Sequence, residues 1–166
     1  MSPSVFVHMV TYNSSPRVVQ SMLSVLSQEQ FTFGENLFLQ CTDNASTNKI
    51  VDEITKQFRE QVPCYRNKDN LGFSGAHNQG VYRFLQSSAQ YLLILNPDTK
   101  LTPHALHTLV QALERDDTAG AASPLLLRCD HELHPLEPAV VDAAGMIMTA
   151  DIRHLDRGSG QPLGNE

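Results

Sequence analysis

A carboxylate suited to metal binding follows the most apolar segment of the chain. Residues 91–95 (YLLIL) form that segment, and Asp98 comes after Asn96 and Pro97. Mg²⁺ and Mn²⁺ bind carboxylate oxygens and keep coordination positions open for phosphate oxygens. An Asp just after the end of an apolar strand is therefore well placed to bind either ion. The alternative is a turn aspartate whose side chain accepts a hydrogen bond from a nearby backbone N–H. The pattern alone leaves both interpretations open.

Two further polar segments could contact a nucleotide. Asp43 follows the apolar residues 37–41, where its carboxylate could accept from a base N–H or a ribose hydroxyl, or could cap the next helix. Residues 70–80 (NLGFSGAHNQG) enter a helix through glycines. Free amides at a helix N-terminus can bind a diphosphate. The segment is neither a Walker loop nor GxGxxG, so its specificity is low.

The histidines are weaker candidates. His104 and His107 lie three residues apart, as do His131 and His134, but a pair without a third ligand is weak evidence for a metal site. His77 lies inside the glycine-containing segment and is the histidine most suited to a functional role.

Alternating strands and helices must position these residues. Runs of β-branched and aromatic residues predict strands over residues 4–10, 37–41, 62–66 and 91–95, with further strands within 119–127 and 140–148. Apolar residues at helical spacing predict helices over 18–26, 50–58, 81–85 and 106–113. Ser15 and Pro16 predict the N-cap and first turn of the first helix. The uninterrupted apolar run 91–95 is typical of a strand buried on both faces.

This alternation predicts an α/β protein with a mainly parallel sheet. Ligands of such sheets bind outside the carboxyl ends of the strands. The polar clusters follow the predicted strands at residues 11–13, 43–44, 67–70 and 96–98. Because the carboxyl ends of parallel strands meet at one edge of the sheet, the sequence predicts a single binding site there.

Composition narrows the class of protein. The chain has 166 residues, 41% of them hydrophobic, and a formal net charge of −6, and it contains no basic cluster of the kind that a nucleic-acid binder needs. We therefore expect no nucleic-acid partner. No apolar run is long enough for a membrane span, and the N-terminal residues do not resemble a secretory signal. Three cysteines without a CxxC pair predict reduced thiols in a cytosolic protein.

Taken in order, the polar segments resemble the family 2 glycosyltransferases of the GT-A fold, especially the bacterial rhamnosyltransferase-like branch. The matching segments are residues 10–13 (VTYN), 42–47 (TDNAST), 70–80 and 93–98 (LILNPD). Residues 141–146 (VDAAGM) through 157–160 (RGSG) are similar to the segment that such enzymes carry next. The resemblance spans nearly the whole chain. It implies an α/β, GT-A (Rossmann-like) fold with a mainly parallel sheet and helices on both faces.

The resemblance also implies the site. Asp98 would bind Mg²⁺ or Mn²⁺ in an NPD form of the family's DXD-type motif, and Asp43 would contact the base or ribose. The other nucleotide-sugar-binding residues would be Thr11, Tyr12, Asn13, Asn70, Gly72, Phe73, Gly75, Asn78 and Asn96. The donor would be a dTDP- or UDP-linked sugar. An inverting enzyme would transfer the sugar to a hydroxyl of a glycan or lipid-linked acceptor, in cell-surface polysaccharide synthesis.

Family members usually continue into an acceptor-binding half that carries the general base, and no such pattern follows Asp98. We therefore expect a truncated arrangement: a nucleotide-sugar-binding domain over residues 1–150, and a loop or tail over 151–166 that leads to an absent acceptor-binding half. The general base stays unassigned. A cytoplasmic location, peripheral association with the inner face of the membrane and a homo-oligomer are all compatible with this interpretation.

Two other functions remain as alternatives. The chain could be a non-catalytic nucleotide-binding module, or a half-enzyme that a partner chain completes. A nucleotidyltransferase is disfavoured, because it would need a basic, glycine-rich loop after the first strand, and residues 11–16 contain neither glycine nor lysine.

Overall fold

The computed structural model describes residues 3–164. The chain forms two compact units, Met1–His107 and Thr108–Glu166, where the sequence predicts one domain over residues 1–150. That residues 1–150 act as one functional domain stays a prediction.

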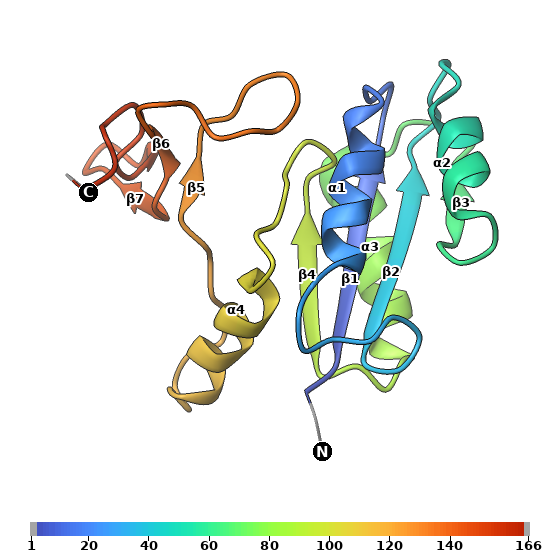
Figure 1. The fold of residues 1–166 in the computed structure, drawn as a ribbon, viewed down its shortest axis with the longest axis horizontal. Helices are drawn as coiled ribbons and strands as arrows, with labels where there is room; N and C mark the ends of the chain where they lie inside the picture. Colours follow the sequence, from blue (N-terminus) through green and yellow to red (C-terminus); the bar gives the residue numbers. More distant parts are fainter. Residues whose placement is uncertain (1–2, 165–166) are drawn as a thin grey trace. The chain divides into compact units, whose positions relative to one another are not determined.

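A four-stranded parallel sheet is the centre of the first unit (Figure 1). Its strands are β1 (Val5–Thr11), β2 (Leu37–Asp43), β3 (Cys64–Arg66) and β4 (Tyr91–Leu95). They lie in the order β3-β2-β1-β4, and every pair is parallel. The predicted parallel sheet is confirmed.

Helices cover both faces of this sheet. Figure 1 shows α1 (Arg17–Leu26) in front of the strands and α3 (Gly72–Leu85) behind them, while α2 (Ile50–Phe58) contacts α1. The apolar stripe of α1 is buried, with Val18 and Met22 both at 0% exposure. Side chains alternate across β1: His8 faces α3, where it contacts His77, so its neighbours point to the α1 side. A fourth helix, α4 (Ala105–Glu114), spans the boundary between the two units.

Several boundaries differ from the sequence prediction. Strand β2 continues through Asp43, beyond the predicted end at residue 41, and α3 already begins at Gly72, well before the predicted helix over 81–85. Helix α1 spans Arg17–Leu26, and Pro16 before it already has helical dihedrals, with φ −55° and ψ −14°. The Ser15 hydroxyl accepts a long, 3.4 Å hydrogen bond from the Arg17 N–H, which is the bond that the predicted Ser15 N-cap would make.

The prediction that residues 91–95 are buried on both faces is wrong. Strand β4 lies at the edge of the sheet, and Ile94 is 40% exposed. An apolar run reflects how much surface a strand can bury, but its actual burial depends on its neighbours. Within the residues that the structure describes, β1 is the one strand that pairs with β4.

The second unit contains two short antiparallel pairs. Strand β5 (Leu126–Leu127) pairs with β6 (Val141–Ala143), and β7 (Met146–Met148) pairs with β8 (His154–Asp156). The strands are shorter than those predicted over 119–127 and 140–148. Strand β8 lies in the segment 151–166, where a loop or tail is expected. Its three exposed residues have no apolar alternation that would have indicated a strand.

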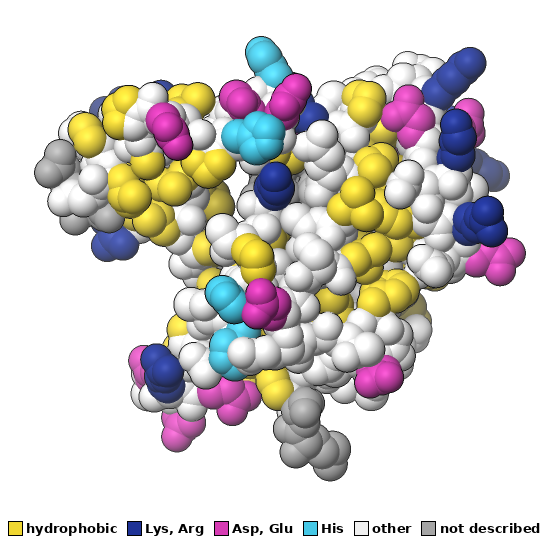
Figure 2. All heavy atoms as spheres, viewed as in Figure 1, with side chains coloured by type: hydrophobic (Ala, Val, Ile, Leu, Met, Phe, Trp, Pro, Cys, Tyr) yellow, Lys and Arg dark blue, Asp and Glu magenta, His cyan; other side chains and the backbone are white. Residues whose placement is uncertain are grey.

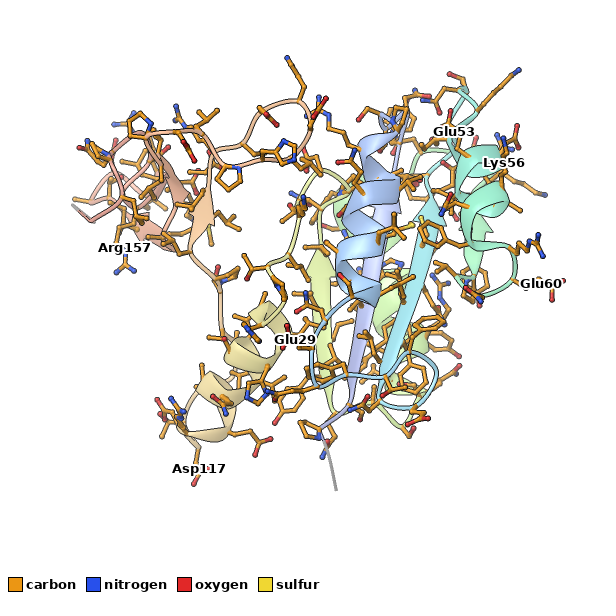
Figure 3. All side chains as sticks on the ribbon, viewed as in Figure 1. Glu29, Glu53, Lys56, Glu60, Asp117 and Arg157 are labelled. Atoms are coloured by element: carbon orange, nitrogen blue, oxygen red, sulfur yellow. The ribbon has the colours of Figure 1, made fainter. Side chains whose placement is uncertain are left out.

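Charged side chains are spread over the surface. Figure 2 shows Lys and Arg dispersed among Asp and Glu on the visible face. On α2, Glu53 and Lys56 point away from the sheet, and Glu60 lies just after the end of the helix (Figure 3). No helix among residues 3–164 combines the length and hydropathy needed to cross a membrane. The three cysteines are free, with Cys41 buried and Cys129 exposed.

Candidate functional site

The strand register places three chemically active side chains in one row. Thr11 of β1 pairs with Asp43 of β2, and Asp43 pairs with Arg66 of β3, all at the carboxyl edge of the sheet. The predicted meeting of polar residues at this edge is therefore present for the first three strands.

Asp43 is the centre of this row and is completely buried. One carboxylate oxygen accepts a 3.2 Å hydrogen bond from the Thr11 hydroxyl, and the other accepts from the Ser46 backbone N–H at 3.1 Å. The Arg66 Nε lies 3.5 Å from the second oxygen and balances the negative charge. A buried carboxylate needs such partners. Asp43 does not cap α2, because its oxygens accept from Thr11 and Ser46, while the first N–H of α2, that of Ile50, donates to the Asn48 side chain at 3.3 Å.

Asn13 joins the loop after β1 to the loop after β2. Its side-chain oxygen accepts hydrogen bonds from the backbone N–H groups of Thr47 and Asn48, at 2.9 and 3.3 Å. Its φ of +50° is in the left-handed region, which Asn tolerates better than most residues. The neighbouring Tyr12 ring is 51% exposed, so the loop holds an aromatic face toward solvent.

Asn44 joins the loop after β2 to the loop before α3. Its amide nitrogen donates to the Asn70 side chain at 2.6 Å and to the Gly72 carbonyl at 3.2 Å. Its oxygen accepts from the Leu71 N–H and from the Asn67 amide, at 3.0 and 3.1 Å. The start of α3 is thereby tied to the ends of β2 and β3.

Two hollows lie next to this edge. One, of about 430 Å³, is lined by Ala45, Ser46, Arg66, Asn67 and Lys68. The other, of about 470 Å³, is lined by Tyr65, Asn67, Gly75, Asn78, Gln79, Tyr82 and Arg83. Gly75 and Asn78 therefore line the second hollow, on the α3 side, and Asn67 lines both hollows. Phe73 is 60% exposed at the start of α3.

The turn after β4 is held separately from the other strand ends. Asn96 and Asp98 are both exposed, and the Ser21 hydroxyl of α1 lies 3.5 Å from the Asn96 carbonyl. Within residues 3–164 no group of three or more His, Cys, Asp or Glu side chains could hold a metal. Mg²⁺ is commonly bound by one or two carboxylates together with substrate phosphates, so a single exposed Asp fits that mode of binding.

A buried polar network lies between β1, β2 and α3. The Nδ1 atoms of His8 and His77 are 3.0 Å apart, and the Nε2 of His8 is 2.9 Å from the Thr42 hydroxyl. Arg83 donates to that hydroxyl at 2.7 Å and to the Gln40 side chain at 3.0 Å. Burial, with smaller effects from His77 and Arg83, lowers the pKa of His8 to about 3. Burial also lowers the pKa of His77.

Sequence reasoning identified His77 but missed the rest of this network. The available signal was His8 within the apolar run of β1, with Gln40 and Thr42 two residues apart on β2. His77 is itself 4% exposed and faces the sheet, and its Nε2 is buried without a hydrogen-bond partner among residues 3–164. In the structure His77 is therefore an internal partner of His8.

Because Gly80 has no side chain, α3 can pack close to His8, so substitution of Gly80 should lower the free energy of unfolding. A Cβ at Gly80 would lie 2.2 Å from the His8 ring, so Gly80→Ala should lower the free energy of unfolding by about 1–3 kcal/mol through overpacking. Gly120→Ala is the control, because a Cβ at Gly120 would have no atom within 4 Å. Urea unfolding measures both variants. Equal stability of the two would contradict the close packing at Gly80.

The parallel sheet with helices on both faces defines an α/β architecture. The family model described as glycosyl transferase family 2 matches residues 6–135. The chain therefore belongs to glycosyltransferase family 2. No curated protein matches the sequence.

Solved structures share the fold. Staphylococcus aureus TarS is 19% identical, with a TM-score of 0.56 over 68% of this chain and 20% of TarS. The Pyrobaculum calidifontis mannosyltransferase PcManGT, solved with GDP-Man and Mn²⁺, is 18% identical, with a TM-score of 0.59 over 68% of this chain and 33% of the enzyme. TarS 1-349 with UDP-GlcNAc is 17% identical, with a TM-score of 0.58 and coverages of 73% and 37%. The chain thus has a GT-A fold and spans a fifth to two fifths of these proteins.

Proposed function

We propose that this chain binds a nucleotide-diphosphate sugar together with Mg²⁺ or Mn²⁺, as the donor-binding part of an inverting glycosyltransferase. The observation that carries the proposal is the in-register row of Thr11, Asp43 and Arg66 at the carboxyl edge, beside an open hollow. Family membership supports it. So do the ligands of two structural neighbours, GDP-Man with Mn²⁺ in one and UDP-GlcNAc in the other.

Recognition of the nucleotide would use the ends of β1 and β2. The exposed Tyr12 ring offers a face on which a base can stack. Asp43 would accept the N3–H of uracil or thymine after the base displaces one of its present donors, while Thr11 and Asn13 keep the loops in place. Adenine has no donor at N1, so uracil or thymine is preferred over adenine.

The diphosphate would bind between the start of α3 and the turn after β4. Backbone N–H groups at the N-terminus of α3, near Gly72, stabilise negative charge there. Asn70, Phe73, Gly75 and Asn78 would flank the sugar diphosphate. Asp98, with Asn96 beside it, would hold the divalent ion, which supplies Lewis-acid stabilisation of the departing diphosphate.

The proposal also covers the sugar donor and the acceptor. We propose a dTDP- or UDP-linked donor, with rhamnose favoured by the resemblance, and a glycan or lipid-linked acceptor in polysaccharide synthesis. A half-enzyme completed by a partner chain is the second candidate, and the exposed apolar side chain of Ile94 on the edge strand β4 favours it. It predicts donor binding with nucleotide release near background until the completing polypeptide is added.

Thermal unfolding with nucleotides tests the proposal. A ligand at ten times its Kd stabilises the native state by about 1.4 kcal/mol, which should raise the Tm by roughly 3–6 °C for a chain of this size. We expect this shift with UDP or dTDP plus Mn²⁺, little shift with ADP, and loss of most of the shift with EDTA. The absence of a shift with every nucleotide would contradict the proposed function.

A further inference from the structure

The face of α1 that meets the chain after β4 is polar and buried. Ser21 and Ser24 of α1, and Gln28 just after it, are 0%, 6% and 3% exposed. Their spacing of three and four residues puts them on one face of the helix. This stripe is separate from the apolar residues with which α1 covers the sheet. Buried hydroxyl and amide groups need hydrogen-bond partners, and all three find them in residues 96–106.

Ser21 contacts the turn that contains Asp98. Its hydroxyl donates to the Thr99 carbonyl and also lies 3.5 Å from the Asn96 carbonyl. The Thr99 N–H donates to the Asn96 carbonyl at 3.3 Å and closes the turn. A single hydroxyl thus fixes the backbone on both sides of Asp98, whose own side chain stays exposed.

Ser24 and Gln28 hold the rest of this segment. The Ser24 hydroxyl accepts from the Leu101 N–H at 3.0 Å. The Gln28 side chain donates to the Thr102 carbonyl at 2.7 Å and accepts from the Leu106 N–H at 2.9 Å. Every contact is to the main chain, in a segment with no helix or strand before α4 begins at residue 105. The segment's backbone path beside α1 (Figure 1) is therefore determined by α1.

We propose that Ser21, Ser24 and Gln28 are positioning residues that hold the Asp98 carboxylate in place before a divalent ion and a diphosphate bind. The inference rests on the proposed function. A turn already ordered in the free protein loses little conformational entropy on binding, so more of the interaction free energy is observed as affinity. Without these hydrogen bonds the turn would have to be ordered by the ligand itself.

The experiment measures UDP affinity by calorimetry, with and without Mn²⁺, for three serine-to-alanine variants. One lost hydrogen bond corresponds to about a fivefold change in an equilibrium constant. We expect Ser21→Ala to reduce the Mn²⁺-dependent gain in UDP affinity by about five- to tenfold, and Ser24→Ala, farther from Asp98, to reduce it less. Ser27→Ala is the matched control, because Ser27 is exposed and its hydroxyl donates only within α1. Metal-free UDP affinity should be the same in all four proteins.

Two further measurements distinguish a positioning role from an effect on overall stability: rescue by a threonine at position 21, and amide hydrogen exchange. Ser21→Thr keeps the hydroxyl and should restore the Mn²⁺-dependent gain. If Ser21→Ala retains the full gain, or if the variants only speed hydrogen exchange of the Leu101 and Leu106 amides, the positioning role is overturned. If the unaltered chain binds UDP with no Mn²⁺ effect, the metal assignment fails as well. If it binds no nucleotide, the proposed function fails.

Discussion

Asp98→Asn should reduce UDP affinity in the presence of Mn²⁺ to the metal-free value, while the fold stays intact. The carboxylate is exposed and follows Pro97 in the turn after β4. Asn is as acceptable as Asp in a turn, so the free energy of unfolding should change by no more than about 0.5 kcal/mol. A neutral amide is a much poorer ligand for a hard divalent cation, which prefers charged oxygen. Calorimetry with and without Mn²⁺, together with urea unfolding, measures both quantities.

The matched control is an exposed aspartate outside the proposed site. Asp117→Asn, at the position labelled in Figure 3, removes the same charge. It should leave Mn²⁺-dependent binding unchanged. If Asp98→Asn also binds UDP with the full Mn²⁺ effect, the carboxylate is a turn residue and the metal must be held elsewhere.

Much of the first unit could be predicted because its signals are local. Residues 91–95 form β4 with the predicted bounds, and residues 50–58 form α2 as the spacing of Ile50, Ile54 and Phe58 indicates. Periodicity within one segment determines such elements without reference to the rest of the chain. The placement of polar clusters at strand ends followed from the parallel sheet, since its carboxyl ends share one edge.

The contacts within the site could not be predicted, because they depend on register. Asn44 and Arg66 are ordinary loop and strand residues in the sequence, and only the folded arrangement of the strands brings Arg66 to Asp43 and Asn44 to the start of α3. Ser21 and Ser24 likewise have the pattern of a solvated helix face. The exposure of Ile94 reflects the position of β4 at the edge of the sheet, and the sequence of β4 does not contain that information.

His8 should make the protein sensitive to acid. Its imidazole is completely buried. Its Nδ1 faces His77 of α3, and its Nε2 faces both Thr42 of β2 and Arg83 of α3. Burial, then the charges of His77 and Arg83, lower its pKa to about 3 in the folded protein. In the unfolded chain a histidine has a pKa of about 6.5. Below that pH the unfolded state binds a proton that the folded state excludes, so stability falls as the pH falls from about 6.5 toward 3.

The size of this effect follows from proton linkage. One excluded proton changes the free energy of unfolding by up to about 1.4 kcal/mol per pH unit, so His8 should account for a loss of roughly 2–3 kcal/mol between pH 6.5 and 4.5.

Urea unfolding at several pH values measures the slope of the free energy of unfolding against pH. His8→Gln keeps polar atoms but cannot titrate, so its slope should be shallower by this amount. His154→Gln, on the exposed strand β8, should have the slope of the unaltered chain. Carboxylates contribute equally to all three proteins and cancel in the comparison. Equal slopes for His8→Gln and the unaltered chain would mean that the folded protein admits a proton at His8, and that the network joining α3 to the sheet opens in acid without a cost in stability.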